Sequence, residues 1–154
     1  MIRKLLLLLS ILGLLTHCGF TPIHLNKNNN FSISTISFKG DKTINNYLKV
    51  NLNQFQNNNF DKKFDLEINT TYKKNILAKD KTAKISSYKL SSYSIIKVNS
   101  KGKLIKEIKV SETKNMNNID DKFEEQKKEN NIKQNFASTM YKRIITEISM
   151  LNDN

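Results

Sequence analysis

The feature that most constrains the fold is an unbroken alternation of apolar and polar residues between positions 64 and 72. One parity carries Phe64, Leu66, Ile68, Thr70 and Tyr72. The other parity carries Asp65, Glu67 and Asn69. Because successive side chains of a strand point to opposite faces, this pattern predicts a β-strand with one face against a core. The chain therefore has to form a sheet that buries one of its faces.

Residues 31–39 predict a strand that precedes this one. Phe31 and Ile33 alternate on one parity, and Ile36 and Phe38 alternate on the other. The change of parity indicates a bulge near Thr35 or burial of both faces of the strand.

A hairpin is predicted after residues 79–82, which form a polar connection. Residues 84–99 are rich in Ser, Tyr, Ile and Val and predict a third strand. Residues 100–103 predict a turn in which Gly102 takes a positive φ. Residues 104–110 predict a fourth strand, with Leu104, Ile108 and Val110 on one parity.

Two helices are predicted by apolar residues at spacings of three and four. The first follows Asp41, a residue suited to cap its N-terminus, and its stripe consists of Ile44, Leu48, Leu52 and Phe55. Asn45 is expected on the opposite, polar face. The second helix is C-terminal, with Asn118 as the expected cap and an acidic start that suits the helix dipole. Its apolar stripe consists of Phe136, Met140, Ile144, Ile148 and Leu151. Residues 126–134 are almost all polar and are expected to fray or project.

The predicted order is therefore β-α-β-β-β-α. We expect an α+β two-layer sandwich, in which a four-stranded mixed sheet carries two helices on one face. The connection between the first two strands contains a helix, so these strands are expected to be parallel.

The N-terminus has the organisation of an export signal. Arg3 and Lys4 precede an apolar run over residues 5–15, which is shorter than the roughly 20 apolar residues that span a bilayer. The only cysteine of the chain, Cys18, follows directly. We interpret residues 1–17 as a lipoprotein signal peptide and Cys18 as the lipidated residue, since two or three acyl chains anchor a protein stably. His17 departs from the small residue that usually precedes such a cysteine, so an ordinary secreted protein with a free thiol is the alternative.

The formal net charge is +12, and only two of the 26 basic residues, Arg3 and Arg143, are arginine. One interpretation is a polyanionic partner such as lipid phosphates or lipopolysaccharide. The other is compositional drift towards lysine on solvated faces. Nucleic acid is not expected as a partner, because the export signal directs the chain out of the cytosol and arginine is scarce.

Residue types that carry catalysis are scarce in the sequence. After removal of the signal peptide His24 is the one histidine, in a predicted tether over residues 18–30. The sequence therefore contains no Cys/His metal set and no serine triad, and it has no glycine-rich phosphate loop. We expect neither an enzyme nor a metal site nor a cofactor.

Four features of the mature chain resemble the lipopolysaccharide-assembly lipoprotein family (LptE, also called RlpB). The start Cys18-Gly19-Phe20-Thr21-Pro22-Ile23 is similar to the CGF-x-P-[LI] start of alphaproteobacterial members. The strand-helix-strand order over residues 31–72, the hairpin over residues 88–110 and the long C-terminal helix with Phe136-Ala137 are the other three. The resemblance covers nearly the whole mature chain, which is predicted to form a single domain over residues 31–154 after the tether.

The resemblance implies an outer-membrane lipoprotein on the periplasmic side, held by its acyl chains. Family members plug a large β-barrel translocon, LptD, help it to assemble, and assist delivery of lipopolysaccharide to the outer leaflet. The implied partners are an LptD-like barrel, lipopolysaccharide and the membrane. Charge placement makes five lysines the candidates for lipopolysaccharide binding: Lys79, Lys81, Lys84, Lys101 and Lys103. They lie in two strand connections at opposite ends of the third strand, so the two groups are not expected to form one patch.

Two alternatives remain from the sequence. One is a freestanding periplasmic lipoprotein that binds a polyanion or a small ligand. The other is a lipoprotein subunit of another envelope assembly, which predicts a different partner but the same fold.

Overall fold

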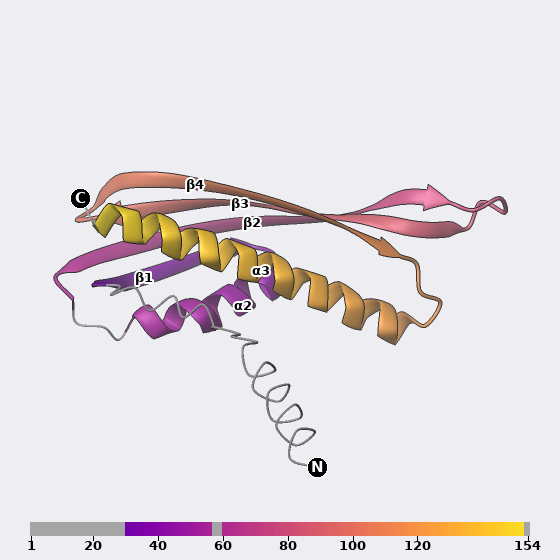
Figure 1. Cartoon of the computed structure of the whole chain (residues 1–154), viewed down its shortest axis with the longest axis horizontal. Coiled ribbons are helices and arrows are strands. Elements are labelled where there is room, and N and C mark those ends of the chain that lie inside the picture. The colour runs from indigo at the N-terminus through magenta and orange to yellow at the C-terminus, as the bar shows by residue number, and fades with distance from the viewer. Residues whose placement is uncertain (1–29, 57–59, 153–154) are drawn as a thin grey trace, which may run out of the picture.

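The computed structural model describes residues 30–56 and 60–152 and has the predicted α+β architecture (Figure 1). The elements are β1 (Phe31–Gly40), α2 (Lys42–Leu52), a short 3-10 helix η2 (Asn53–Phe55), β2 (Lys62–Lys79), β3 (Ile85–Ser100), β4 (Lys103–Asn117) and α3 (Lys122–Asn152). The strands form one sheet in the order β1-β2-β3-β4. β1 pairs with β2 in parallel and the other pairs are antiparallel, as predicted. Both helices lie on one face of the sheet. The predicted signal peptide, Cys18 and the tether up to residue 29 lie outside the described residues.

β1 contains the predicted bulge. Its register with β2 shifts between Ile33 and Thr35, so Ser34 is the extra residue. Phe31 and Ile33 before the bulge are fully buried, whereas Ile36 and Phe38 after it are partly buried against the core. The bulge explains why the apolar residues change parity.

α2 covers the part of the sheet where β1 begins. The Asp41 carboxylate caps the helix as predicted, accepting a hydrogen bond from the Ile44 backbone N–H at 2.9 Å. The predicted stripe is buried, and Phe55 stacks on Phe31 with ring centroids 5.3 Å apart. The prediction for Asn45 was wrong: it is only 6% exposed, because its amide nitrogen donates to the Lys39 carbonyl at 3.0 Å across the β1–α2 corner.

The β3–β4 hairpin has the predicted turn, but the start of β4 differs from the prediction. Lys101 and Gly102 both have positive φ, at 50° and 75°, as a two-residue type I′ turn requires. The register shift after Val98 skips Ile105, so Leu104 pairs with Asn99 instead of continuing the parity of Ile108. Leu104 is consequently 56% exposed, and the expectation that it shares a buried face with Ile108 was wrong.

α3 runs diagonally under the sheet and is helical along its whole described length (Figure 1). Asp121 caps it in place of Asn118, since its carboxylate accepts from the backbone N–H groups of Phe123 and Glu124 at 2.8 and 3.2 Å. The predicted apolar stripe is confirmed, with Phe136, Met140, Ile144 and Ile148 buried and Leu151 partly buried. Residues 126–134 belong to the helix and pack on β2, which the sequence did not predict.

The β2–β3 hairpin extends past the rest of the sheet (Figure 1). The last pair between β3 and β4 is Ser87 with Asn117, and beyond it only β2 and β3 remain paired. Within the described part of the chain, no helix has the length and apolar character needed to cross a membrane.

Candidate functional site

The five candidate lysines form two groups at the two ends of β3. Lys79, Lys81 and Lys84 lie at the end of the β2–β3 hairpin, and Lys101 and Lys103 lie at the β3–β4 turn. All five are exposed. β3 has 16 residues, which at about 3.3 Å each separates the groups by roughly 50 Å. The sheet therefore brings together the members of each group and keeps the two groups apart, as the sequence predicts.

The tip of the β2–β3 hairpin, residues 76–85, is organised around Asp80. The Asp80 carboxylate accepts hydrogen bonds from the Thr82 hydroxyl and backbone N–H, both at 2.8 Å, and from the Lys84 N–H at 3.0 Å. The Thr82 hydroxyl, followed by the two backbone donors, lowers the pKa of this carboxyl. Asp80 thus holds the connection in shape. None of the three surrounding lysines forms an ion pair with any residue in the described ranges.

Exposed apolar side chains accompany the cations at this tip. Ile76 and Leu77 are 52% and 47% exposed, and a register shift separates Ile76 from Ala78. Cationic groups beside apolar ones suit an amphiphilic anion, in which phosphates adjoin acyl chains. The chemistry of the tip therefore fits a lipid headgroup better than a small soluble anion.

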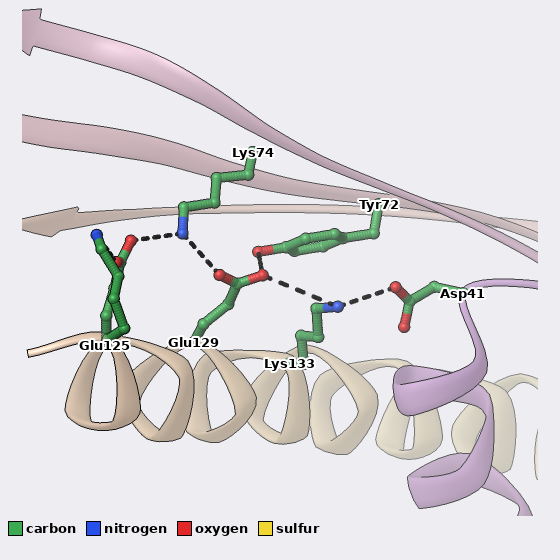
Figure 2. Close-up of polar contacts among 7 residues, drawn as sticks. Asp41, Tyr72, Lys74, Glu125, Glu129 and Lys133 are labelled. Atoms are coloured by element: carbon green, nitrogen blue, oxygen red, sulfur yellow. Dashed lines mark hydrogen bonds and ion pairs between the residues drawn. The ribbon is translucent and has the colours of Figure 1, made fainter. Parts of the chain in front are cut away.

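A network of ion pairs supports the hairpin from α3 (Figure 2). Lys74 on β2 bridges two carboxylates of the helix, with its Nζ 2.7 Å from Glu125 and 2.8 Å from Glu129. Lys122 adds a second cation to Glu125 at 2.6 Å. Hydrogen bonds from Lys122 and then Lys74 lower the pKa of Glu125. Burial opposes the charged form of Lys74, but its two carboxylate partners outweigh burial and raise its pKa.

The same network reaches α2 through Lys133. Its Nζ lies 3.0 Å from Asp41, the capping residue of α2, and 4.0 Å from the centre of the Tyr72 ring. The Tyr72 hydroxyl donates to Glu129 at 2.9 Å. Burial and the neighbouring Glu129 raise the pKa of Tyr72, so this hydroxyl stays a donor. Charged side chains therefore connect α2, α3 and β2 where the apolar core ends.

Sequence reasoning treated the acidic start of α3 as a solubility feature and missed this network. A signal was present, because Glu125, Glu129 and Lys133 are four residues apart and continue the helical face of Phe136 and Met140. Tyr72 and Lys74 likewise continue the buried parity of β2. Polar residues that extend an apolar stripe on two facing elements indicate a contact rather than a fraying end.

The helix-free face of the sheet is polar. A shallow groove of about 640 Å³ lies on it, lined mainly by β1, β2 and β3. Side chains in the groove bond to one another: the Thr35 hydroxyl donates to Asp65 at 2.7 Å, and the Asn99 amide donates to Glu67 at 3.0 Å. Across residues 30–56 and 60–152, no three His, Cys, Asp or Glu side chains are grouped so that they could hold a metal ion.

Comparison with solved structures defines the class of fold: it is the fold of small bacterial lipoproteins. The rare lipoprotein B of Shewanella oneidensis superposes with a TM-score of 0.58 over 78% of this chain and 97% of that one, at 12% sequence identity. A minor lipoprotein of Acinetobacter baumannii gives 0.55 over 77% and 92%, at 15% identity. An uncharacterized lipoprotein B of Nitrosomonas europaea gives 0.50 over 80% and 88%, at 12% identity.

The chain thus has the fold of rare lipoprotein B, the fold that the resemblance to the LptE (RlpB) family implies. No family model matches the sequence. No curated protein matches it either. At these identities the likeness concerns the fold.

Proposed function

We propose that this chain is a lipid-anchored outer-membrane protein that occupies the lumen of an LptD-type β-barrel and assists delivery of lipopolysaccharide to the outer leaflet. The observation that carries the proposal is the combination of a Cys18-Gly19-Phe20 start after an export signal with the fold of rare lipoprotein B. The start indicates the anchor, and the fold is that of a lipoprotein, so the two observations agree.

The distribution of polar surface supports the lumen as the place of the domain. The helix-free face carries carboxylates, amides and hydroxyls that already bond to one another. A barrel lumen is polar, so such a face can meet it without losing hydrogen bonds. The role is structural and one of binding; no catalytic step is part of the proposal.

The β2–β3 hairpin is the part best suited to meet lipopolysaccharide. Lys79, Lys81 and Lys84 surround exposed Ile76 and Leu77, and lipid A presents phosphates next to acyl chains. The ion pairs from Lys74 to α3 hold this hairpin in a fixed direction.

The test is affinity purification of the C-terminally tagged full chain from detergent-solubilised outer membranes, with all co-purifying proteins identified. The proposal expects a large β-barrel in near-stoichiometric amount. Recovery of the chain alone would overturn it in favour of a freestanding polyanion-binding lipoprotein. Recovery with a different set of proteins would indicate another envelope assembly.

A second experiment tests the lipopolysaccharide contact by removing equal charge at two places. Exchanging Lys79, Lys81 and Lys84 for Gln should weaken binding of purified protein to lipopolysaccharide about tenfold or more. Exchanging Lys49, Lys128 and Lys142 for Gln is the matched control, because these lysines are exposed on the helices. Equal losses in both variants would mean that net charge alone drives binding.

A further inference from the structure

The end of the sheet opposite the hairpin tip is where the predicted anchor joins the domain. β1 begins at Phe31, which pairs with Lys62 at the start of β2. The β3–β4 turn lies beside it, since the Ser100 hydroxyl donates to the Lys63 carbonyl at 3.1 Å. α3 also ends here (Figure 1). The twelve residues 18–29 connect Cys18 to this end and span at most about 43 Å when extended.

This end carries cations without partners. Lys63, Lys101 and Lys103 are exposed and form no ion pair with any residue in the described part of the chain. Two carboxylates are near in sequence: Asp61 is exposed, and Asp65 accepts the Thr35 hydroxyl on the helix-free face. Lysines therefore dominate the turn itself.

Exposed apolar side chains adjoin these cations. The register shift at the start of β4 leaves Leu104 56% and Ile105 48% exposed. Lysines beside exposed aliphatic side chains are typical of surfaces that rest in the interfacial region of an anionic membrane.

We propose that Lys63, Lys101, Lys103, Leu104 and Ile105, here called the anchor-end surface, dock the domain on anionic phospholipid headgroups. The proposal rests on the lipid anchor at Cys18 of the proposed function, because the anchor keeps this end within reach of the leaflet and raises the local lipid concentration. Docking would hold the long sheet upright, with the β2–β3 hairpin pointing away from the leaflet before the domain meets a barrel.

The absence of tryptophan from the chain allows a direct test with a single reporter. The lipidated full chain carrying Leu104→Trp is inserted into preformed vesicles of phosphatidylethanolamine and phosphatidylglycerol. Headgroup-attached nitroxides should quench its emission strongly. The matched reporter is Leu77→Trp at the hairpin tip, where the native leucine is 47% exposed, and it should be quenched little. Equal quenching at the two positions would overturn the proposal.

The second arm measures affinity without the anchor, using the mature chain with Cys18→Ser. Among the described residues the buried core runs from Phe31 to Ile148, and the Cys18→Ser form contains all of these residues. Exchanging Lys63, Lys101 and Lys103 for Gln should lower the affinity for the phosphatidylglycerol vesicles by the order of a hundredfold. The same exchange at Lys49, Lys128 and Lys142, which are exposed on the helices, should lower it far less. Equal losses, or binding to pure phosphatidylcholine vesicles that is as tight, would overturn the proposal.

The two proposals fail in distinguishable ways. The mass of the N-terminal peptide reports acylation of Cys18 and therefore tests the anchor alone. The vesicle affinity of the Cys18→Ser form tests the anchor-end surface alone. A chain that binds anionic vesicles through Lys101 and Lys103 but lacks acyl groups would retain the surface and lose the lipoprotein assignment.

Discussion

The two halves of α3 hold the sheet by different means. Residues 136–151 pack Phe136, Met140, Ile144 and Ile148 into a closed apolar core. Residues 122–135 contribute Ile132 to that core but hold β2 and α2 mainly with charges, through Glu125, Glu129 and Lys133. Apolar burial depends little on pH or salt, whereas ion pairs depend on both. We therefore expect the apolar half to respond less to pH and salt than the charged support of the β2–β3 hairpin does.

The largest expected effect is a cavity in the apolar half. Phe31→Ala removes a fully buried ring that stacks on Phe55 and packs edge-to-face with Phe64, with the two ring centroids 6.1 Å apart. We expect the free energy of unfolding to fall by about 4 kcal/mol. Urea denaturation of the mature chain with Cys18→Ser measures this change. Phe123→Ala is the control, since that ring is 71% exposed and its loss should cost less than about 0.5 kcal/mol. Similar losses in the two variants would contradict the placement of the core.

A smaller loss is expected from the charged half. Lys133→Met removes the ion pair with Asp41 and the cation over Tyr72, while Glu129 keeps its pair with Lys74. We expect the free energy of unfolding to fall by about 2 kcal/mol, because a mostly buried carboxylate loses its partner. Amide exchange should speed up in residues 122–135 more than in residues 136–151.

Lys128→Met is the control for that variant, since Lys128 is an exposed lysine of the same helix. If both variants unfolded at the same urea concentration, the contacts of Lys133 in Figure 2 would contribute nothing to stability.

The same contrast explains which parts of the molecule the sequence predicted. Apolar stripes have a period, so the buried faces of α2, of β2 and of the second half of α3 followed from spacing alone. Helix caps had to be predicted from single residues. Several acids and amides before α3 are suitable caps, so the sequence pointed to Asn118 instead of Asp121. The bulge at Ile105 could not be recognised in the sequence. One unpaired residue moves Leu104 to the other face of the sheet, but no residue type there marks the shift.

The positions of the candidate lysines were predicted well because these residues lie in turns or at the strand ends next to them. Turns are recognisable from Gly102 and from the polar run at 79–82. Their support was not predicted. The four-residue spacing of Glu125, Glu129 and Lys133 indicates that this helical face makes contacts, but it does not identify the partner. Nothing in the sequence near Lys74 names Glu125, 51 residues away, as the carboxylate that it pairs with. For the same reason Asn45 was expected at the surface although it bonds to the Lys39 carbonyl.

Acid should weaken the charged half through Glu125. Lys122 and Lys74 hold the pKa of Glu125 below its ordinary value of 4.5, so the unfolded chain binds this proton more readily than the folded one. The stability that Glu125 contributes is therefore present above about pH 4.5 and is lost as the pH falls through the lower, folded pKa. Glu125→Gln should cost about 1 kcal/mol near neutral pH and flatten the fall in unfolding free energy below pH 4.5.

Glu124→Gln is the matched control for the acid titration. Its carboxylate is 52% exposed and, among the described residues, forms an ion pair with Lys127 alone, at 3.5 Å, so its removal should change the pH dependence little. Some acid loss should persist in both variants, because Glu147 in the apolar half pairs with Lys106 and Arg143 and its pKa is lowered as well. If the unfolding free energy of Glu125→Gln fell as steeply with acid as that of the unsubstituted chain, Glu125 would contribute nothing to the acid response.

The smallest expected effect concerns the hairpin tip, where an alanine has a backbone conformation that suits glycine better. Ala83 has a φ of 63°, in the left-handed region where a side chain is strained. Ala83→Gly should relieve that strain and raise the free energy of unfolding. The gain should be only about 0.5 kcal/mol, because the freedom that glycine adds to the unfolded chain offsets part of the relief. Because the tip lies beyond β4, the gain should appear as slower amide exchange in residues 76–85 and not in the apolar half of α3.

Gly102→Ala at the other turn should lower the free energy of unfolding. The new Cβ would meet no atom within 4 Å, but the φ of 75° is a conformation that a residue with a side chain rarely adopts. If amide exchange in Ala83→Gly instead slowed equally in residues 76–85 and along both halves of α3, the hairpin and the rest of the domain would unfold as one unit. The ion pairs of Lys74 with α3 would then couple the hairpin tightly to the helix.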